Sequence, residues 1–132
     1  MTQEEKDLLL KDLCARLPYG VICKVEHKDA EGRKTEKMLL SGIFNDKAYF
    51  IDDKGSTYSN DYFPYLRPMS SMIEEEYIEY SSIEAQCLYD DGKLISDGKG
   101  IDYLNSHHFD YKGLIEKGLA IEAPEGMYNL KH

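Results

Sequence analysis

The sequence predicts an α+β fold in which an N-terminal helix packs on a small antiparallel sheet or SH3-like barrel, followed by C-terminal helices and a terminal β-hairpin. Two observations predict it. Apolar residues follow helical spacing before Gly20 and alternate with polar residues after it. Helix-capping patterns return after Pro68. With 132 residues the chain has the size of one ordinary domain, so we predict a single domain over 1–132, with a helix and sheet portion at 1–67 and a helical and hairpin portion at 68–132.

The N-terminal helix is predicted over residues 3–16. Thr2 and Glu5 have the spacing of a capping box, in which each side chain bonds the backbone N–H of the other residue. The apolar residues that follow keep helical spacing: Leu8, Leu9, Leu10, Leu13 and Leu17. The segment Pro18-Tyr19-Gly20 then ends the helix.

Four or five short antiparallel strands are predicted to follow. Val21, Cys23 and Val25 alternate with Ile22, Lys24 and Glu26, as in a strand with one covered face. A second strand is interrupted by Gly42, and the dipeptide Asn45-Asp46 joins it to a third, because both residues tolerate the positive φ angles of a tight hairpin. The strands after the first are predicted at residues 37–44, 47–52, 56–58 and 62–66.

The second half is predicted to begin with an acidic helix. Ser71 and Glu74 have capping-box spacing, the helix runs to about Ser82, and Ile73, Tyr77 and Tyr80 share one of its faces. A strand pair is predicted next, from the segments "AQCLY" and "KLIS" on either side of Asp90-Asp91-Gly92.

The stretch "NSHHFDYKG" is predicted to join two helices. A first helix would end near His107 and place His108 on its inner face. Asp110 would cap a second helix over 111–117, with Gly118 after its last residue. Phe109 and Leu119 would then both pack on Leu114. The turn Pro124-Glu125-Gly126 would form the terminal hairpin between "LAIEA" and "MYNL".

The histidine stretch also raises the hypothesis of a metal or general-base site. Adjacent histidines on a helix point about 100° apart and rarely bind one ion together. No H-E-x-x-H or C-x-x-C accompanies them. We therefore predict no catalytic, cofactor-binding or metal-binding residue, and an enzyme with a site near His107 and His108 stays an alternative. Cys14, Cys23 and Cys87 are interpreted as small buried hydrophobic residues.

The net charge of −9 disfavours a nucleic-acid partner, because phosphate affinity comes from Lys and Arg. A winged helix over residues 105–132 is an alternative, although that stretch holds three lysines and four acids. Residues 68–104 hold nine acids and two lysines, a net of −7, which indicates a solvated face or one that docks on a basic protein. The N-terminus lacks a signal pattern and no apolar run could span a membrane, so we expect a cytoplasmic protein.

Eleven tyrosines without a tryptophan suggest a contact surface, since tyrosine is enriched at protein interfaces. Ordinary half-buried packing explains them as well. The candidate interaction surface comprises Tyr62, Tyr65, Arg67, Tyr77 and Tyr80. We therefore expect a non-enzymatic protein-binding or accessory module with a protein partner.

Three segments are distinctive together: "LLKDLCARLPYGV", "PYLRPMSSM" and "HHFDYKGLIEKGLAIEAPEGMY". They resemble the shared segments of a family of small uncharacterised proteins of gut Bacteroidetes and of their phages and mobile elements. The match covers about a third of the chain. The resemblance implies lineage, including a phage or mobile-element origin, and a cytoplasmic setting. It assigns no residue a role.

Overall fold

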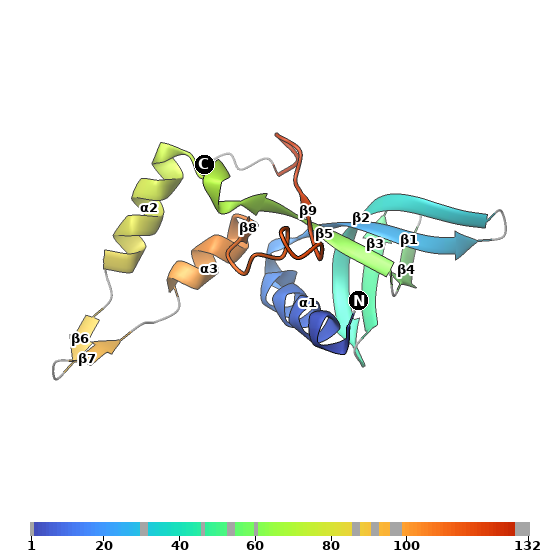
Figure 1. Cartoon of the computed structure of the whole chain (residues 1–132), viewed down its shortest axis with the longest axis horizontal. Coiled ribbons are helices and arrows are strands. Elements are labelled where there is room, and N and C mark those ends of the chain that lie inside the picture. The colour runs from blue at the N-terminus through green and yellow to red at the C-terminus, as the bar shows by residue number, and fades with distance from the viewer. Residues whose placement is uncertain are drawn as a thin grey trace.

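The computed structural model describes residues 2–29, 32–45, 47–52, 55–59, 61–85, 88–90, 93–95 and 99–128 (Figure 1). The elements in chain order are α1 (Gln3–Arg16), η1 (Leu17–Tyr19), β1 (Ile22–Asp29), β2 (Gly32–Phe44), β3 (Lys47–Asp52), β4 (Gly55–Ser59), β5 (Asp61–Pro68), η2 (Met69–Ser71), α2 (Glu74–Ala85), β6 (Leu88–Asp90), β7 (Lys93–Ile95), α3 (Lys99–Ser106), β8 (Phe109–Asp110) and β9 (Ile121–Glu122). The α+β class is as predicted.

The N-terminal helix has the predicted bounds. The backbone N–H of Glu5 donates to Thr2 Oγ1 at 3.1 Å, and the N–H of Thr2 donates to Glu5 Oε1 at 2.9 Å, which completes the capping box. The helix passes into the short 3-10 helix η1, and Gly20 follows with a φ of 73°. That left-handed conformation turns the chain into β1 and favours glycine.

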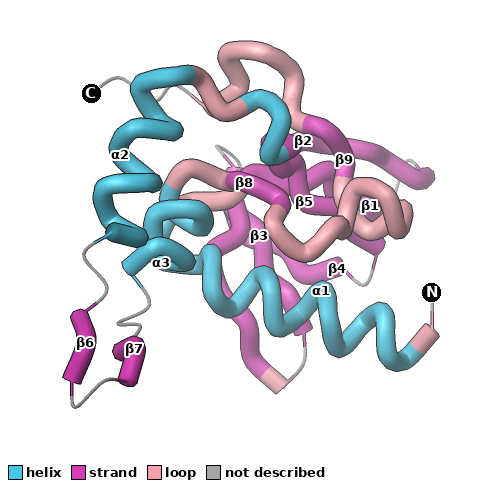
Figure 2. Tube along the Cα trace, turned by 60° about the vertical axis from the view of Figure 1, so that its left-hand side comes forward, coloured by secondary structure: helices cyan, strands magenta, loops and turns pink. Residues whose placement is uncertain are grey.

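The main sheet has the order β4-β3-β2-β1-β5-β8, and β9 also pairs with β5. Neighbouring strands from β4 to β5 are antiparallel, whereas β8 and β9 pair in parallel with the second half of β5. Because β4 and β8 lie at opposite edges, the sheet is open and does not close into an SH3-like barrel. Helix α1 lies across one face of it (Figure 2).

The main core lies between α1 and that face. Leu9 and Leu13 of α1 are buried in it with the predicted alternating residues of β1. The pairing of β2 with β3 shifts register between Leu40 and Gly42, which is the interruption expected at that glycine. Asn45 adopts a φ of 51° in the turn to β3, as predicted, while Asp46 lies outside the described residues.

A second core packs α2 and α3 together with β8. Its buried members are Tyr103, Leu104 and Phe109, and Met72, Tyr80, Ile83 and Tyr111 pack against them. The predicted capping box of α2 is wrong, because Ser71 Oγ donates to the Pro68 carbonyl instead. Glu76 takes the role and accepts the N–H of Ile73 at 3.1 Å.

The predicted helix over 111–117 is also wrong, and with it the second helix that a winged helix requires. Gly113 has a φ of 74°, so only one helical turn forms after it. Asp110 caps this turn, since its carboxylate accepts the N–H groups of Leu114 and Ile115, each at 2.9 Å. Gly118 ends the turn at a φ of 74°, as predicted, but Phe109 belongs to the second core and Leu114 to the main core.

The C-terminal segment does not start a hairpin as predicted, because β9 pairs in parallel with β5. Residues 129–132 lie outside the described part. The predicted strand pair further up the chain is present as β6 and β7, which are antiparallel. Cys23 is buried as expected, but Cys14 is exposed on α1, and Cys87 lies outside the described residues.

Candidate functional site

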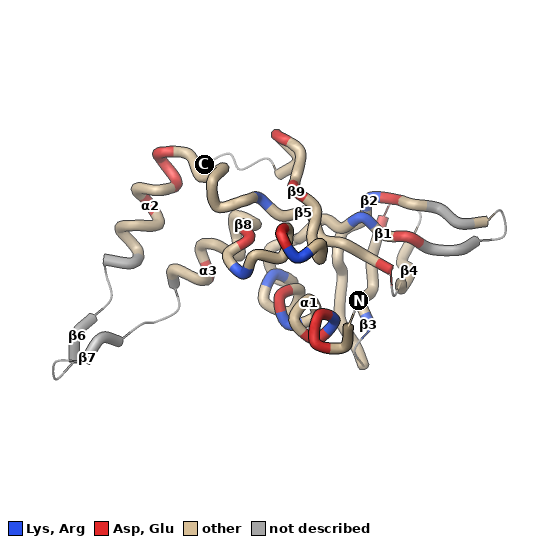
Figure 3. Tube along the Cα trace, in the orientation of Figure 1, with Lys and Arg blue, Asp and Glu red and all other residues tan. Residues whose placement is uncertain are grey.

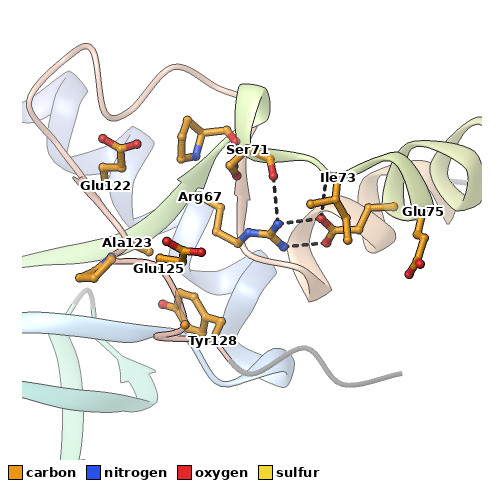
Figure 4. Close-up of a pocket in the computed structure, with 12 residues that line it drawn as sticks. Arg67, Ser71, Ile73, Glu75, Glu122, Ala123, Glu125 and Tyr128 are labelled. Atoms are coloured by element: carbon orange, nitrogen blue, oxygen red, sulfur yellow. Dashed lines mark hydrogen bonds and ion pairs between the residues drawn. The ribbon is translucent and has the colours of Figure 1, made fainter.

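A groove of about 820 Å³ lies between the start of α2, the end of β5 and the segment after β9 (Figure 4). Its charged lining residues are Arg67, Glu75, Glu76, Glu122 and Glu125. Its apolar and aromatic lining includes Pro68, Ile73, Ala123, Pro124 and Tyr128. We call this space the acidic groove.

Arg67 of β5 forms the groove's central ion pair. Its Nη1 and Nη2 atoms donate to the two carboxylate oxygens of Glu76, each at 2.7 Å, in a bidentate arrangement. The guanidinium carbon also lies 4.2 Å from the centre of the Phe109 ring. Burial acts to raise the pKa of Glu76, but hydrogen bonds from Arg67 and from the Ile73 N–H outweigh it and lower that pKa. The pair therefore stays ionised and neutralises itself.

The remaining charges of the groove are all negative. Four glutamates and one arginine line it, so the lining has a net charge of −3. Once Arg67 and Glu76 are paired, this charge belongs to Glu75, Glu122 and Glu125, which are exposed and form no ion pair with the described residues. Figure 4 shows Glu122 and Glu125 on the β9 side of Arg67 and Glu75 on the α2 side. A cationic group is the ligand that this groove favours.

Tyr128 forms one wall of the groove and ties the C-terminal segment to the sheet. Its hydroxyl donates to the Tyr65 carbonyl at 2.6 Å and accepts the N–H of Ile22 at 2.9 Å. Its ring stacks on His108, with 3.7 Å between the ring centres. One phenol thus joins β1, β5 and the junction after α3.

His108 is buried behind Tyr128 and has a structural role. Its φ of 63° reverses the chain between α3 and β8, and its carbonyl accepts the N–H of Arg67 at 2.7 Å. Its Nδ1 atom has no hydrogen-bond partner among the described residues. Burial, followed by the positive charges of Arg16, His107 and Arg67, lowers the pKa of His108 to about 4.

His108 is expected to make stability fall with acidity. The imidazole has an ordinary pKa of 6.5. As the pH falls below this value, the unfolded chain binds a proton at His108 that the folded chain does not bind. This contribution is intact above pH 6.5 and is lost as the pH falls to about 4. At about 1.4 kcal/mol per pKa unit, the loss in the free energy of unfolding is about 2–3 kcal/mol.

The matched variant is His108→Asn, because asparagine tolerates a positive φ and does not titrate. Urea unfolding of both proteins is measured between pH 7 and pH 4, and one free energy of unfolding is subtracted from the other. The subtraction removes the contribution of the carboxylates that both proteins contain. The difference in the free energy of unfolding should change by about 2–3 kcal/mol over this range. A difference that is constant with pH would contradict the assignment.

The structure does not bring the predicted interaction residues into one surface. Tyr62 and Tyr65 are buried, and Tyr80 is half buried, with its ring 6.1 Å from that of Tyr103. Arg67 lies in the groove, and Tyr77 is 61% exposed on α2.

The histidine stretch, which the sequence offered only as an alternative metal or general-base site, does not show the convergence that a metal requires. The His107 ring stacks on Tyr103 at 4.0 Å, and the Asp110 carboxylate is used by backbone N–H groups. Within the described ranges, no group of three or more His, Cys, Asp or Glu side chains could hold a metal ion. Glu122, Glu125 and Tyr128 were not predicted as site residues, because only the parallel pairing of β9 with β5 brings them to Arg67.

An exposed apolar strip on α2 continues from the groove. It consists of Ile73, Tyr77 and Ile78, which are 54%, 61% and 56% exposed. Ile73 also lines the groove, so the two surfaces are continuous. The exposed residues Glu74 and Glu75 lie beside this strip, and Figure 3 shows acidic positions along the helix. We call the strip with these two glutamates the α2 face.

The chain matches no protein-family model, and comparisons with curated proteins and with solved structures found no match. The resemblance to the Bacteroidetes family therefore stays a prediction. None of the helices in the described part of the chain has the length and apolar character needed to cross a membrane.

Proposed function

We propose that this chain is a non-enzymatic protein-binding module that takes a basic, amphipathic segment of a partner protein. The segment lies along the α2 face with its cationic side chains in the acidic groove. The observation that carries this proposal is the continuity of the two surfaces: Ile73 belongs to both, and three glutamates without ion-pair partners among the described residues line the same groove.

The two surfaces would contribute differently to binding. Exposed apolar side chains gathered on one helix face are typical of protein interfaces, and tyrosine is enriched there. The α2 face would supply most of the affinity, because burial of Ile73, Tyr77 and Ile78 removes apolar area from water. The carboxylates of Glu75, Glu122 and Glu125 would accelerate association and select a basic partner.

Fluorescence anisotropy with a defined probe tests this proposal. The probe is a labelled peptide of about 18 leucines and lysines, patterned so that the leucines share one helix face. We expect binding that weakens as salt rises from about 50 to about 500 mM. Tyr77→Ser, and separately the double variant Glu122→Gln/Glu125→Gln, should each raise the Kd at least about fivefold.

The matched control is Glu4→Gln/Glu116→Gln, which removes two exposed carboxylates outside the groove and the α2 face. It changes the net charge by the same amount as the groove variant. The Kd of this control should stay within about twofold of the unsubstituted chain. Equal losses in the groove variant and the control would mean that only net charge attracts the probe, and the proposal would be abandoned.

A further inference from the structure

The sheet face opposite α1 exposes several apolar side chains. Strand alternation directs Cys23, Met38 and Phe50 into the core, so their sequence neighbours lie on the other face. There Leu39 and Ile51 are direct partners across β2 and β3, and both are exposed. Phe44 and Tyr58 extend the same surface at 67% and 47% exposure. We call this surface the outer sheet face.

Three lysines accompany these apolar side chains. Lys24 and Lys37 are direct partners across β1 and β2, two residues along the strands from Ile22 and Leu39 and on the same face. Lys47 of β3 lies with its Nζ 5.1 Å from the centre of the Tyr58 ring. Alternation also places two acids on this face, Glu26 of β1 and Asp61 of β5. They are paired in register at the far end of the strands. The apolar centre of the face therefore carries a positive local charge in a chain of net −9.

A second groove, of about 600 Å³, hollows the outer sheet face where the C-terminal segment meets it. Ile22, Leu39 and Met127 are among its apolar lining residues, and its charged lining residues are Lys37 and Glu125. An apolar side chain carried by a helix can enter such a space while acids beside it reach the lysines. This is the pattern that the α2 face presents, with Tyr77 and Ile78 beside Glu74 and Glu75.

Helix α2 does not lie on the outer sheet face of its own molecule. Figure 1 shows α2 at one end of the chain's longest axis and strands β2, β3 and β4 at the other. We infer that the outer sheet face binds the α2 face of a second copy of this chain, with Tyr77 in the second groove and Glu74 and Glu75 beside Lys24 and Lys37. This inference rests on the proposed function, because it names the outer sheet face of a second copy as a partner of the α2 face.

Charge complementarity selects this occupant. Each face is apolar at its centre, and the charges beside the centres have opposite signs. Two outer sheet faces, or two α2 faces, would bring like charges together, which disfavours packing between identical faces. The contact is therefore heterologous: it uses different surfaces on the two copies, and each copy keeps one face available for another contact.

Sedimentation velocity on the full chain, from about 10 to about 500 μM, tests the inference. The unsubstituted chain should associate reversibly, and less at high salt. Lys24→Glu/Lys37→Glu disables the outer sheet face, and Tyr77→Ser/Glu75→Lys disables the α2 face. Each variant alone should require at least about tenfold higher concentration to associate. Lys6→Glu/Lys117→Glu, with both positions exposed elsewhere, is the matched control and should associate normally.

Mixing the two disabled variants is the decisive measurement, because each retains the face that the other lacks. The mixture should form a one-to-one complex although neither variant associates alone. Circular dichroism and thermal unfolding verify that both variants are folded. A mixture that stays monomeric while the unsubstituted chain associates would overturn the heterologous contact.

A chain that is monomeric at every concentration would overturn the inference outright. The leucine-lysine peptide distinguishes this result from failure of the proposed function. If the monomeric chain still binds that peptide through the α2 face, the proposed function stands without self-association. If the peptide also fails to bind, both are wrong.

Discussion

Arg16→Met is expected to lower the free energy of unfolding by about 3–5 kcal/mol, a large part of the stability of a domain of this size. Arg16 has no exposed side-chain surface, and its Nε donates to the equally buried Asp12 at 2.8 Å. Its Nη2 donates to the Phe109 carbonyl at 2.6 Å. After the substitution Asp12 is still in the core. Its remaining ion-pair partner there is Lys112, whose Nζ lies 3.5 Å from Asp12 Oδ1.

The double variant Asp12→Leu/Arg16→Met is the informative control. Replacing both members of a buried ion pair by apolar residues is often neutral, because the desolvation cost of both charges disappears. Urea unfolding should therefore show the double variant recovering most of the stability that Arg16→Met loses. A single variant that loses less than about 1 kcal/mol would mean that water or Lys112 already compensates the aspartate.

Arg67→Met is expected to cost about 3 kcal/mol and to release α2 from the sheet. The Glu76 side chain is almost fully buried, and Arg67 supplies its bidentate partner. Without the guanidinium, the pKa of Glu76 should rise, because burial would then dominate. The loss should concentrate in residues 74–85, since the pair joins α2 to β5.

Hydrogen exchange resolved by residue tests this localisation. Amide protection in α2 should decrease more than protection in β1 and β2. Arg67→Lys keeps the charge but cannot form the bidentate arrangement, so most of the loss should remain in it. Uniform loss of protection throughout the chain would show that Arg67 stabilises the whole domain instead of anchoring one helix.

The elements of the N-terminal half were predictable because their signals are local. The capping box of Thr2 and Glu5 lies within four residues, and the turn residue Asn45 lies between the two strands that it joins. The alternation of Val21, Cys23 and Val25 gave the buried face of β1 correctly. The choice between open sheet and barrel was left undecided, because it depends on whether the edge strands meet.

The second half depends on contacts that are distant in sequence. Parallel pairing of β8 and β9 with β5 leaves no turn signal, so the segment after Gly118 was predicted to form a hairpin. The pattern over 111–117 predicted a helix, but the positive φ of Gly113 prevents a continuous helix there. Glu76 looked like a solvated first-turn acid, although its carboxylate is buried against Arg67. The acidic groove depends on the pairing of β9 with β5 and on the Arg67–Glu76 pair, and was therefore missed.

The hydrogen bond from Arg16 to the Phe109 carbonyl joins residues 93 positions apart. During synthesis on the ribosome, α1 and the strands β1–β4 emerge long before that carbonyl does. Until then Arg16 Nη2 lacks its acceptor, and packing of α1 on the sheet would bury an N–H donor without a hydrogen bond. The order of translation thus delays closure of the main core until the C-terminal segment arrives, so truncated chains should remain open and accessible to proteases.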